Sequence, residues 1–274
     1  MTTTLRPSGP LQQSADGAKS RTFDVCVNSR PVGAIELGTH AVFGPRVGQI
    51  RALRIDERDR GRGRGTVAAL AAEEVVRGWG CTRIEATVPA TATEALHLAT
   101  ALGYVERNRQ LAKPLPTVPE ALPEGVRGRP MTEAEYGPWI AAENESYVRT
   151  WVARGVPEAE ARAKAEADHA ASLPNGLASP DTNLSVLEAD GTPVGTLWVA
   201  LLGDTAFVYD VRVDEAHRGR GHGRSLMLLA EQQAHASGSA AMGLNVFAGN
   251  TTALRLYESL GYEPTSYYLY KQLL

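Results

Sequence analysis

Residues 211–223 read VRVDEAHRGRGHG, a glycine-rich run that follows an alternating segment and precedes an apolar one. The alternation over 205–213 predicts a strand, and the pattern over about 224–235 predicts a helix. Glycine permits positive φ and has no Cβ, so backbone N–H groups can converge on an anion where the helix begins. Neighbouring arginines add charge-assisted contacts to phosphate. The run therefore predicts a pyrophosphate-binding loop.

Two other protein classes carry similar runs. Arg-Gly repeats occur in disordered nucleic-acid-binding tails, but here a strand pattern precedes the run and a helix pattern follows it. Dinucleotide-binding folds use G-x-G-x-x-G with an acidic residue about 20 positions further on. This run is spaced R-x-x-G-x-G and lacks that acidic residue, so it favours a different phosphate site.

The same pattern occurs twice. Residues 60–65 read RGRGRG and residues 218–223 read RGRGHG, while Leu-Gly-Tyr occurs at 102–104 and again at 260–262. Both pairs are separated by 158 residues, and a shorter match, RPVG at 30–33 with TPVG at 192–195, is separated by 162. Three matches in one order indicate two copies of one domain.

The two copies set the expected domain boundaries. Residues 1–20 are polar and predict a flexible leader, and residues 21–115 form the first copy. Residues 116–126 belong to a proline-rich stretch that excludes regular helix and central strand, so they predict a linker. The second copy then occupies 127–274.

Both copies predict an α/β fold with a mixed, mostly antiparallel sheet. In the second copy, two helices at about 132–171 precede three strands, and strand–helix–strand units end the domain. Thr132 is the expected N-cap of the first helix, with Glu135 three residues later. The first copy has matching strands and helices but no room for the two leading helices.

Composition restricts the partners. The formal net charge of −3 argues against nucleic acid, and no apolar run reaches the ~18 residues that span a membrane. Two cysteines in 274 residues do not form a disulfide framework, so a reducing cytoplasm is expected. The sequence indicates no metal site and no oligomeric state.

These motifs resemble a known family. The segment 211–223 is similar to the acyl-CoA signature of GNAT-type N-acetyltransferases, and residues 250–262 match the family pattern N-x-x-A-x-x-x-Y-x-x-x-G-[FY]. The resemblance covers 127–274 fully and 21–115 in part, and a tandem with one impaired copy is similar to mycothiol synthase. It implies acetyl-CoA as co-substrate, bound in a gap between two splayed strands, and a small-molecule amine as acceptor.

The resemblance also implies roles for single residues. Backbone groups of Val211 and Val213 would hold pantetheine and polarise the acetyl carbonyl, Asn250 would bind the pantetheine arm, and Tyr257 would protonate the leaving thiolate. On spacing alone the pattern favours Tyr257 as a core aromatic, and Asn250 is alternatively only the N-cap of the helix at Thr251, whereas the full motif favours the functional roles. The pyrophosphate would be held by the loop residues Arg218, Gly219, Arg220, Gly221, His222, Gly223 and Arg224.

The general base is left open. Asp210 on the strand before the loop is one candidate, and Glu143 or Glu145 from the first helix is another. As a structural alternative, Asp210 would pair with a nearby arginine. Three tyrosines of the last strand are candidates for lining the acceptor pocket, and equally for packing at a domain interface: Tyr267, Tyr268 and Tyr270.

The first copy departs from the pattern. Ala92 stands opposite Asn250 and Ala99 opposite Tyr257, while the glycine run is intact. We therefore expect the second copy to be the catalytic one and the first to bind a phosphate-bearing ligand or to serve a structural role. An acyl-CoA sensor without turnover and a protein N-acetyltransferase are the alternative functions.

Overall fold

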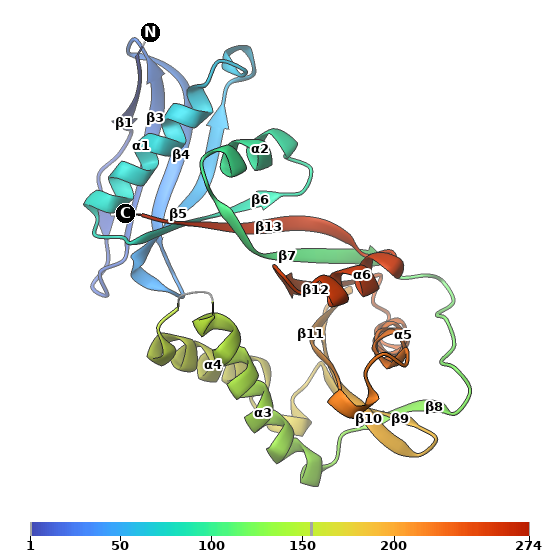
Figure 1. Ribbon diagram of the computed structural model, residues 1–274. Helices are drawn as coiled ribbons and strands as arrows, with labels where there is room; N and C mark the ends of the chain where they lie inside the picture. Colours follow the sequence, from blue (N-terminus) through green and yellow to red (C-terminus); the bar gives the residue numbers. More distant parts are fainter. Residues whose placement is uncertain (1, 154–155, 274) are drawn as a thin grey trace. The chain divides into compact units, whose positions relative to one another are not determined.

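The computed structural model describes residues 2–153 and 156–273, and the chain divides into two compact units (Figure 1). Unit 1 comprises Met1–Arg109 together with Thr265–Leu274, and unit 2 comprises Gln110–Pro264. Both are α/β. No helix within the described ranges is long and apolar enough to cross a bilayer.

Unit 1 has strands in the order β1-β3-β4-β5-β6-β13, with β2 beside β3. Its helices α1 and α2 follow β5 and β6, and a 3-10 turn, Glu57–Asp59, precedes α1. The elements are β1 (Thr3–Pro7), β2 (Gln12–Gln13), β3 (Lys19–Val27), β4 (Arg30–His40), β5 (Gly44–Ile55), α1 (Arg64–Gly78), β6 (Arg83–Pro89), α2 (Thr93–Ala101) and β13 (Glu263–Gln272).

Unit 2 has strands in the order β7-β12-β11-β10-β9-β8. Two helices precede β9, and 3-10 turns occur at Gly176–Ala178 and Glu215–His217. The elements are β7 (Val105–Pro114), β8 (Val126–Pro130), α3 (Glu133–Val152), α4 (Glu158–Ser172), β9 (Thr182–Ala189), β10 (Thr192–Leu202), β11 (Thr205–Val213), α5 (His222–Ala236), β12 (Ala241–Phe247) and α6 (Thr251–Ser259).

The expected N-cap of α3 is confirmed. The Glu135 carboxylate accepts hydrogen bonds from the Thr132 backbone N–H at 2.8 Å and from its hydroxyl at 2.7 Å. This carboxylate also accepts from the Arg129 guanidinium, which holds the pKa of Glu135 well below its ordinary value. The start of α3 is thereby tied to β8.

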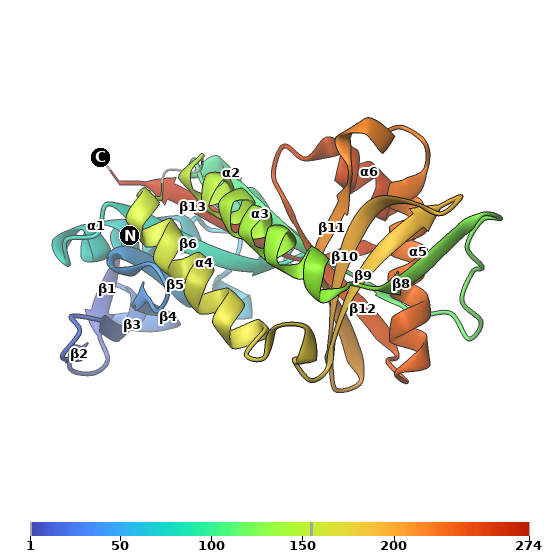
Figure 2. The ribbon, with the colours of Figure 1, turned by 90° about the horizontal axis from the view of Figure 1, so that it is seen from below.

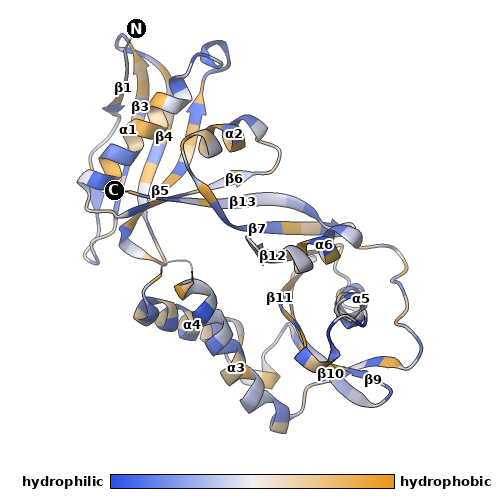
Figure 3. Cartoon of the chain, viewed as in Figure 1, coloured by the Kyte–Doolittle hydropathy of each residue, from blue (hydrophilic) through white to orange (hydrophobic). Residues whose placement is uncertain are grey.

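The sheet of unit 2 is covered on both faces. Along β10, Leu197 and Val199 belong to the large core beneath α5, whereas Trp198 between them packs with Trp139 of α3, because successive strand residues face opposite sides. Figures 1 and 2 show β9–β11 lying between α3 and α4 on one side and α5 on the other. In Figure 3, α4 carries hydrophilic residues over much of its surface, which agrees with its single buried stripe of Ala161, Ala165 and His169.

A parallel strand pair occurs in each unit. In unit 2 the β11–β12 register runs for four residue pairs, from Thr205↔Ala241 to Val208↔Leu244, and β11 continues to Val213. In unit 1 the β5–β6 register likewise runs from Val47↔Arg83 to Ile50↔Ala86, and β5 continues to Ile55. Both units therefore have a splayed strand pair, as expected from the resemblance.

The last strand of each sequence copy completes the other unit. Lys271 of β13 donates to both carboxylate oxygens of Glu73 at 2.9 and 2.7 Å, and its ammonium lies 5.8 Å from the Tyr104 ring in unit 1. In unit 2, Lys113 of β7 binds Glu231 in the same way, at 2.9 Å to each oxygen. Its ammonium lies 5.6 Å from the Tyr262 ring. The two lysines are 158 residues apart, the same offset that relates the two copies, so they occupy equivalent positions. Each unit binds its lysine with one glutamate and one tyrosine, and we call this arrangement the lysine socket.

Two expectations about the ends of the domains need correction. Residues 3–7 of the expected leader form β1, which pairs antiparallel with β3, because an extended chain satisfies its backbone groups on that strand edge. Residues 265–274 belong to unit 1, although they follow the second copy in sequence. The stretch 116–126 has no regular element before β8 begins at Val126, and it packs on α5 through hydrogen bonds to its Thr117 and Glu120 carbonyls.

The lysine anchors give a test of this strand exchange. Lys271→Met should reduce the stability of unit 1 by about 3 kcal/mol, because the Glu73 carboxylate stays buried without its cation. Adding Glu73→Gln removes that charge and should restore most of the loss. Urea denaturation followed by circular dichroism measures both, and Lys113→Met with Glu231→Gln is the matched pair in unit 2. An unchanged unfolding midpoint in Lys271→Met would contradict the proposed anchor.

Candidate active site

A pocket of about 630 Å³ opens in unit 2 where β11 leaves β12. This volume lies within the range of small-molecule sites. Most of the residues singled out from the sequence line it, together with Arg212, Thr252, Ala253 and Leu256. The predicted lining residues are Val211, Val213, Arg218, Gly219, Gly221, His222, Gly223, Arg224, Asn250 and Tyr257.

The glycine loop has the conformation that an anion site requires. Gly219 and Gly221 have φ of +76° and +85°, and a Cβ at either position would meet open space. Gly221 is the N-cap of α5, so the first N–H groups of that helix are directed at the pocket mouth. A Cβ on Gly223 would lie 3.2 Å from Leu256 Cδ2, so this glycine serves the close packing of α5 on α6. Arg220 is exposed and does not line the pocket.

The splay leaves one strand edge for a ligand. Val211 and Val213 pair with Leu197 and Gly195 of β10 on one side of β11. On the other side the described register with β12 ends at Val208, and both valines line the pocket there. Their backbone groups can therefore pair with an extended ligand as a strand would.

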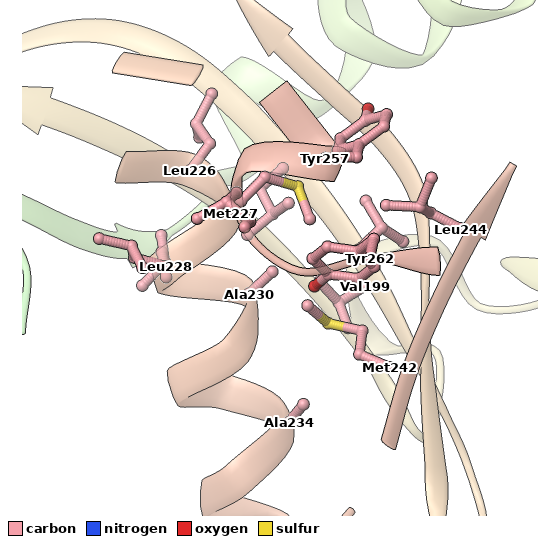
Figure 4. Close-up of a cluster of buried hydrophobic side chains, with 14 of the residues drawn as sticks. Val199, Leu226, Met227, Leu228, Ala230, Ala234, Met242, Leu244, Tyr257 and Tyr262 are labelled. Carbon is pink, nitrogen blue, oxygen red and sulfur yellow. The ribbon is translucent and has the colours of Figure 1, made fainter. Parts of the chain in front are cut away.

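Tyr257 both packs in the core of unit 2 and lines the pocket. Its side chain is only 5 % exposed, and its ring lies 6.1 Å from that of Tyr262 within the core of unit 2. Figure 4 shows its hydroxyl pointing away from the other labelled core side chains. Burial, followed by the Asp210 charge, raises the pKa of Tyr257 to about 12, so its phenol stays protonated at neutral pH.

Asn250 is the N-cap of α6. Its side-chain oxygen accepts a hydrogen bond from the Ala253 N–H at 3.2 Å, and the residue is exposed at the pocket. The alternative role of Asn250 as a helix N-cap is thus confirmed. The amide NH₂ group, which does not serve the cap, can still donate to a ligand.

Two carboxylates and one guanidinium meet on the α3 face of β11. Arg212 forms an ion pair with Glu143 of α3, and its guanidinium lies 3.8 Å from Asp210 Oδ1. Burial and the neighbouring Asp210 charge raise the pKa of Glu143 to about 7, and burial also raises the pKa of Asp210. With one cation between two buried carboxylates, the pair can hold a proton near neutral pH.

The other candidates for the base and for the acceptor pocket lie away from Asp210 and Arg212. Glu145 is exposed and pairs with Arg162 at 2.9 Å, so the structure brings Glu143, and not Glu145, to Asp210. Tyr267, Tyr268 and Tyr270 lie on β13, which belongs to unit 1. There Tyr267 packs on the core with the Arg109 guanidinium 5.0 Å from its ring centre.

Comparison with known proteins decides the family. The family model described as acetyltransferase (GNAT) family matches residues 4–104 and again residues 145–262. The chain belongs to the GNAT family. It is an acyltransferase with two GNAT regions, and acetyl-CoA is the acetyl donor of that family.

Individual relatives agree with this assignment. The uncharacterised N-acetyltransferase YycN of Bacillus subtilis is 30 % identical over 151 residues, which cover 53 % of this chain and 96 % of that protein. A mycothiol acetyltransferase of Streptosporangium roseum is 41 % identical over 76 residues, which are 25 % of this chain and 23 % of that protein. The solved structure of a GCN5-related N-acetyltransferase from Sphaerobacter thermophilus shares the fold, with a TM-score of 0.56, 20 % identity, and coverage of 92 % and 80 %.

The first GNAT unit has the same scaffold with different side chains. Gly61 and Gly63 have φ of +68° and +71°, and Gly63 is the N-cap of α1. The splay of β5 and β6 contains an apolar pocket of about 310 Å³ that Ala92 and Ala99 help to line. Alanine therefore replaces the amide and the phenol at the two equivalent positions of this pocket, as the alignment of the copies predicted, and Tyr104 also lines it.

Sequence reasoning gave Arg212 no site role. In the structure its positive charge partly offsets the effect of burial, which raises the pKa of both carboxylates. The signal that could have found it is the alternation of β11, which puts 210 and 212 on one face.

The two N-cap glycines make a matched test of the loop. Gly221→Ala forces a side chain into the left-handed region beside the pocket, and Gly63→Ala imposes the same strain in unit 1. We expect Gly221→Ala to weaken acetyl-CoA binding at least tenfold, about 1.4 kcal/mol. Gly63→Ala should leave the rate of acetyl transfer within about threefold, less than ~1 kcal/mol of barrier. Calorimetry and steady-state thiol release measure the two effects, and the reverse pattern would assign the working site to unit 1.

Proposed function

We propose that unit 2 transfers an acetyl group from acetyl-CoA directly to a primary amine of a small molecule. The observation that carries this proposal is one pocket, into which the glycine loop, the free edge of β11 and Tyr257 all face. The likeness to a mycothiol acetyltransferase covers only a quarter of the chain, so it supports a small-molecule acceptor without naming one.

Binding of the donor rests on backbone groups. The N–H groups at the start of α5 and the side chains of Arg218 and Arg224 supply positive potential for a pyrophosphate. Backbone groups of Val211 and Val213 hold the pantetheine arm along the strand edge, and a fixed N–H there polarises the acetyl carbonyl. Asn250 donates to the same arm with its NH₂ group.

Removal of the amine proton falls to the carboxylate pair. Asp210 and Glu143 together retain a proton below about pH 7, and once that proton is lost the ionised pair can accept the proton of the attacking amine, directly or through water. Arg212 keeps the pair from being fully protonated. Its contact with both carboxylates also fixes their orientation.

Protonation of the leaving thiolate falls to Tyr257. Its raised pKa means that it enters the reaction protonated, and its buried ring fixes the direction of the hydroxyl. Unit 1 has alanine at the positions of Asn250 and Tyr257, so we assign it no turnover of its own.

Tyr257→Phe tests the acid. The substitution keeps the ring in the core and removes the hydroxyl, so the melting temperature and the affinity for acetyl-CoA should change little. A positioned acid contributes about 10²–10⁴-fold, and a thiol is already a fair leaving group, so kcat should drop at least tenfold. Thiol release with a saturating amine measures this effect. Normal kcat with a lowered melting temperature would make Tyr257 a packing residue only.

The carboxylate pair predicts a pH profile. A free amine and an ionised base are both needed, so log kcat/KM for the amine should rise with a slope near two below about pH 7. Above this break the base is fully ionised, only the free amine still increases, and the slope should fall to one. Glu143→Gln releases Arg212 to Asp210 and should move the break to lower pH, whereas Asp210→Asn should reduce the rate itself. A single slope from pH 5 to 9 in the wild type would contradict this pair as the base.

A further inference from the structure

The α3 face of β11 carries an aromatic stack beside the carboxylate pair. The pairing of β10 with β11 shifts register between Trp198 and Val199, so Tyr209 is an extra residue, a bulge next to Asp210. The Tyr209 ring stacks on Trp198 at 4.7 Å and 21°. Trp198 in turn stacks on His169 of α4 and meets Trp139 of α3 edge-on at 5.8 Å.

Only the outer ring of this stack is accessible. Trp139 and Trp198 are 6 % and 3 % exposed, whereas Tyr209 is 45 % exposed. The Tyr209 ring is supported by Trp198 and by the Phe207 ring, which meets it edge-on at 5.2 Å, and its exposed part is a ready contact surface for another flat or apolar group. Next to it, Asp210 Oδ2 is buried without a hydrogen-bond partner among the described residues.

Unit 1 has different residues at the positions equivalent to Tyr209 and Trp198, and it lacks the amide and phenol of the unit 2 site. Its β4–β5 pairing has the same register shift, which makes Arg51 the extra residue, and Glu36 stands opposite Ala52 as Trp198 stands opposite Asp210. Arg51 and Glu36 form an exposed ion pair at 3.5 Å. The scaffold is thus built equally well with charged residues here, so folding alone does not require the exposed tyrosine of unit 2.

We propose that Tyr209, supported by Trp198, is the acceptor platform, and that the acceptor is an amine carried on an aromatic or similarly flat apolar group. The inference rests on the proposed function of unit 2. The apolar part lies against the Tyr209 ring, and the free amine faces Asp210 and Glu143. The nitrogen attacks the acetyl carbonyl, its surplus proton passes to the ionised pair, and Tyr257 protonates the sulfur as the thioester carbon–sulfur bond breaks and the amide remains. Acceptors with a carboxylate next to the amine are disfavoured by the same two carboxylates.

Three amines separate the contributions to recognition. 2-Phenylethylamine carries a ring and an amine, ethylamine lacks the ring, and phenylalanine adds a carboxylate. We expect kcat/KM to be highest for 2-phenylethylamine, and at least tenfold lower for each of the other two. Calorimetric titration of 2-phenylethylamine in the presence of CoA gives a readout that does not need turnover.

Variants at the bulge test the platform. Tyr209→Ala should raise the KM for 2-phenylethylamine about fivefold, with the KM for acetyl-CoA unchanged and a smaller effect on ethylamine, which has no ring to lie on the platform. Tyr209→Phe keeps the ring and should behave as the wild type. Arg51→Ala at the equivalent position of unit 1 should have no effect. Because Tyr209 is 45 % exposed and lies outside the buried core, these variants should fold, and melting curves check this.

The possible failures can be told apart. No thiol release with any amine would overturn the proposed function, and calorimetry would then still decide the platform through the loss of binding in Tyr209→Ala. Turnover that is equal for phenylalanine and 2-phenylethylamine, or an unchanged KM in Tyr209→Ala, would overturn the platform and leave the acetyltransferase intact.

Discussion

The parallel pairing of β11 with β12 lasts for four residue pairs, and the site depends on where it stops. Past Val208 the backbone groups on one side of β11 have no strand partner in that register, so they are directed into the pocket. The glycine loop follows a few residues later, which places the N-terminus of α5 at the same opening. A longer register would satisfy these backbone groups within the sheet and close the space that a thioester arm needs.

The two units show how much of this arrangement belongs to the scaffold. The splay, the bulge, the left-handed glycines and the lysine socket occur in both. The units differ at the cleft and the bulge, where alanines and an ion pair in unit 1 replace polar and aromatic groups in unit 2, and they differ in α3 and α4, which have no counterpart before β3 in the described residues of unit 1. The two copies thus share the sheet and the glycine loop, whereas the side chains of the cleft and the covering helices distinguish unit 2.

Electrostatics in unit 2 depend on burial more than on the number of charges. Glu143 and Asp210 are ordinary acids in sequence, but in the structure they are buried beside α3, and the Arg212 guanidinium is the cation that pairs with both. The same covering helix supplies Trp139 to the aromatic stack, so base and platform have a common structural origin. In unit 1, within the described residues, no helix precedes β3, and its bulge carries an exposed ion pair instead.

The sequence by itself determined the family resemblance, the two copies, the glycine loop and the positions of Asn250 and Tyr257, because each is a local pattern with fixed spacing. It also gave the capping box of α3, which four consecutive residues specify. Only the tertiary structure decided three further points. The last strand of each copy lies in the other unit. Both units offer the same glutamate contact to a lysine, so the local sequence does not reveal in which unit each lysine binds. Burial showed that Glu143, and not Glu145, lies beside Asp210, and a bulge in β11 places the Tyr209 ring on Trp198. Burial and strand register arise from contacts between segments that are distant in the chain, so the sequence alone did not reveal them.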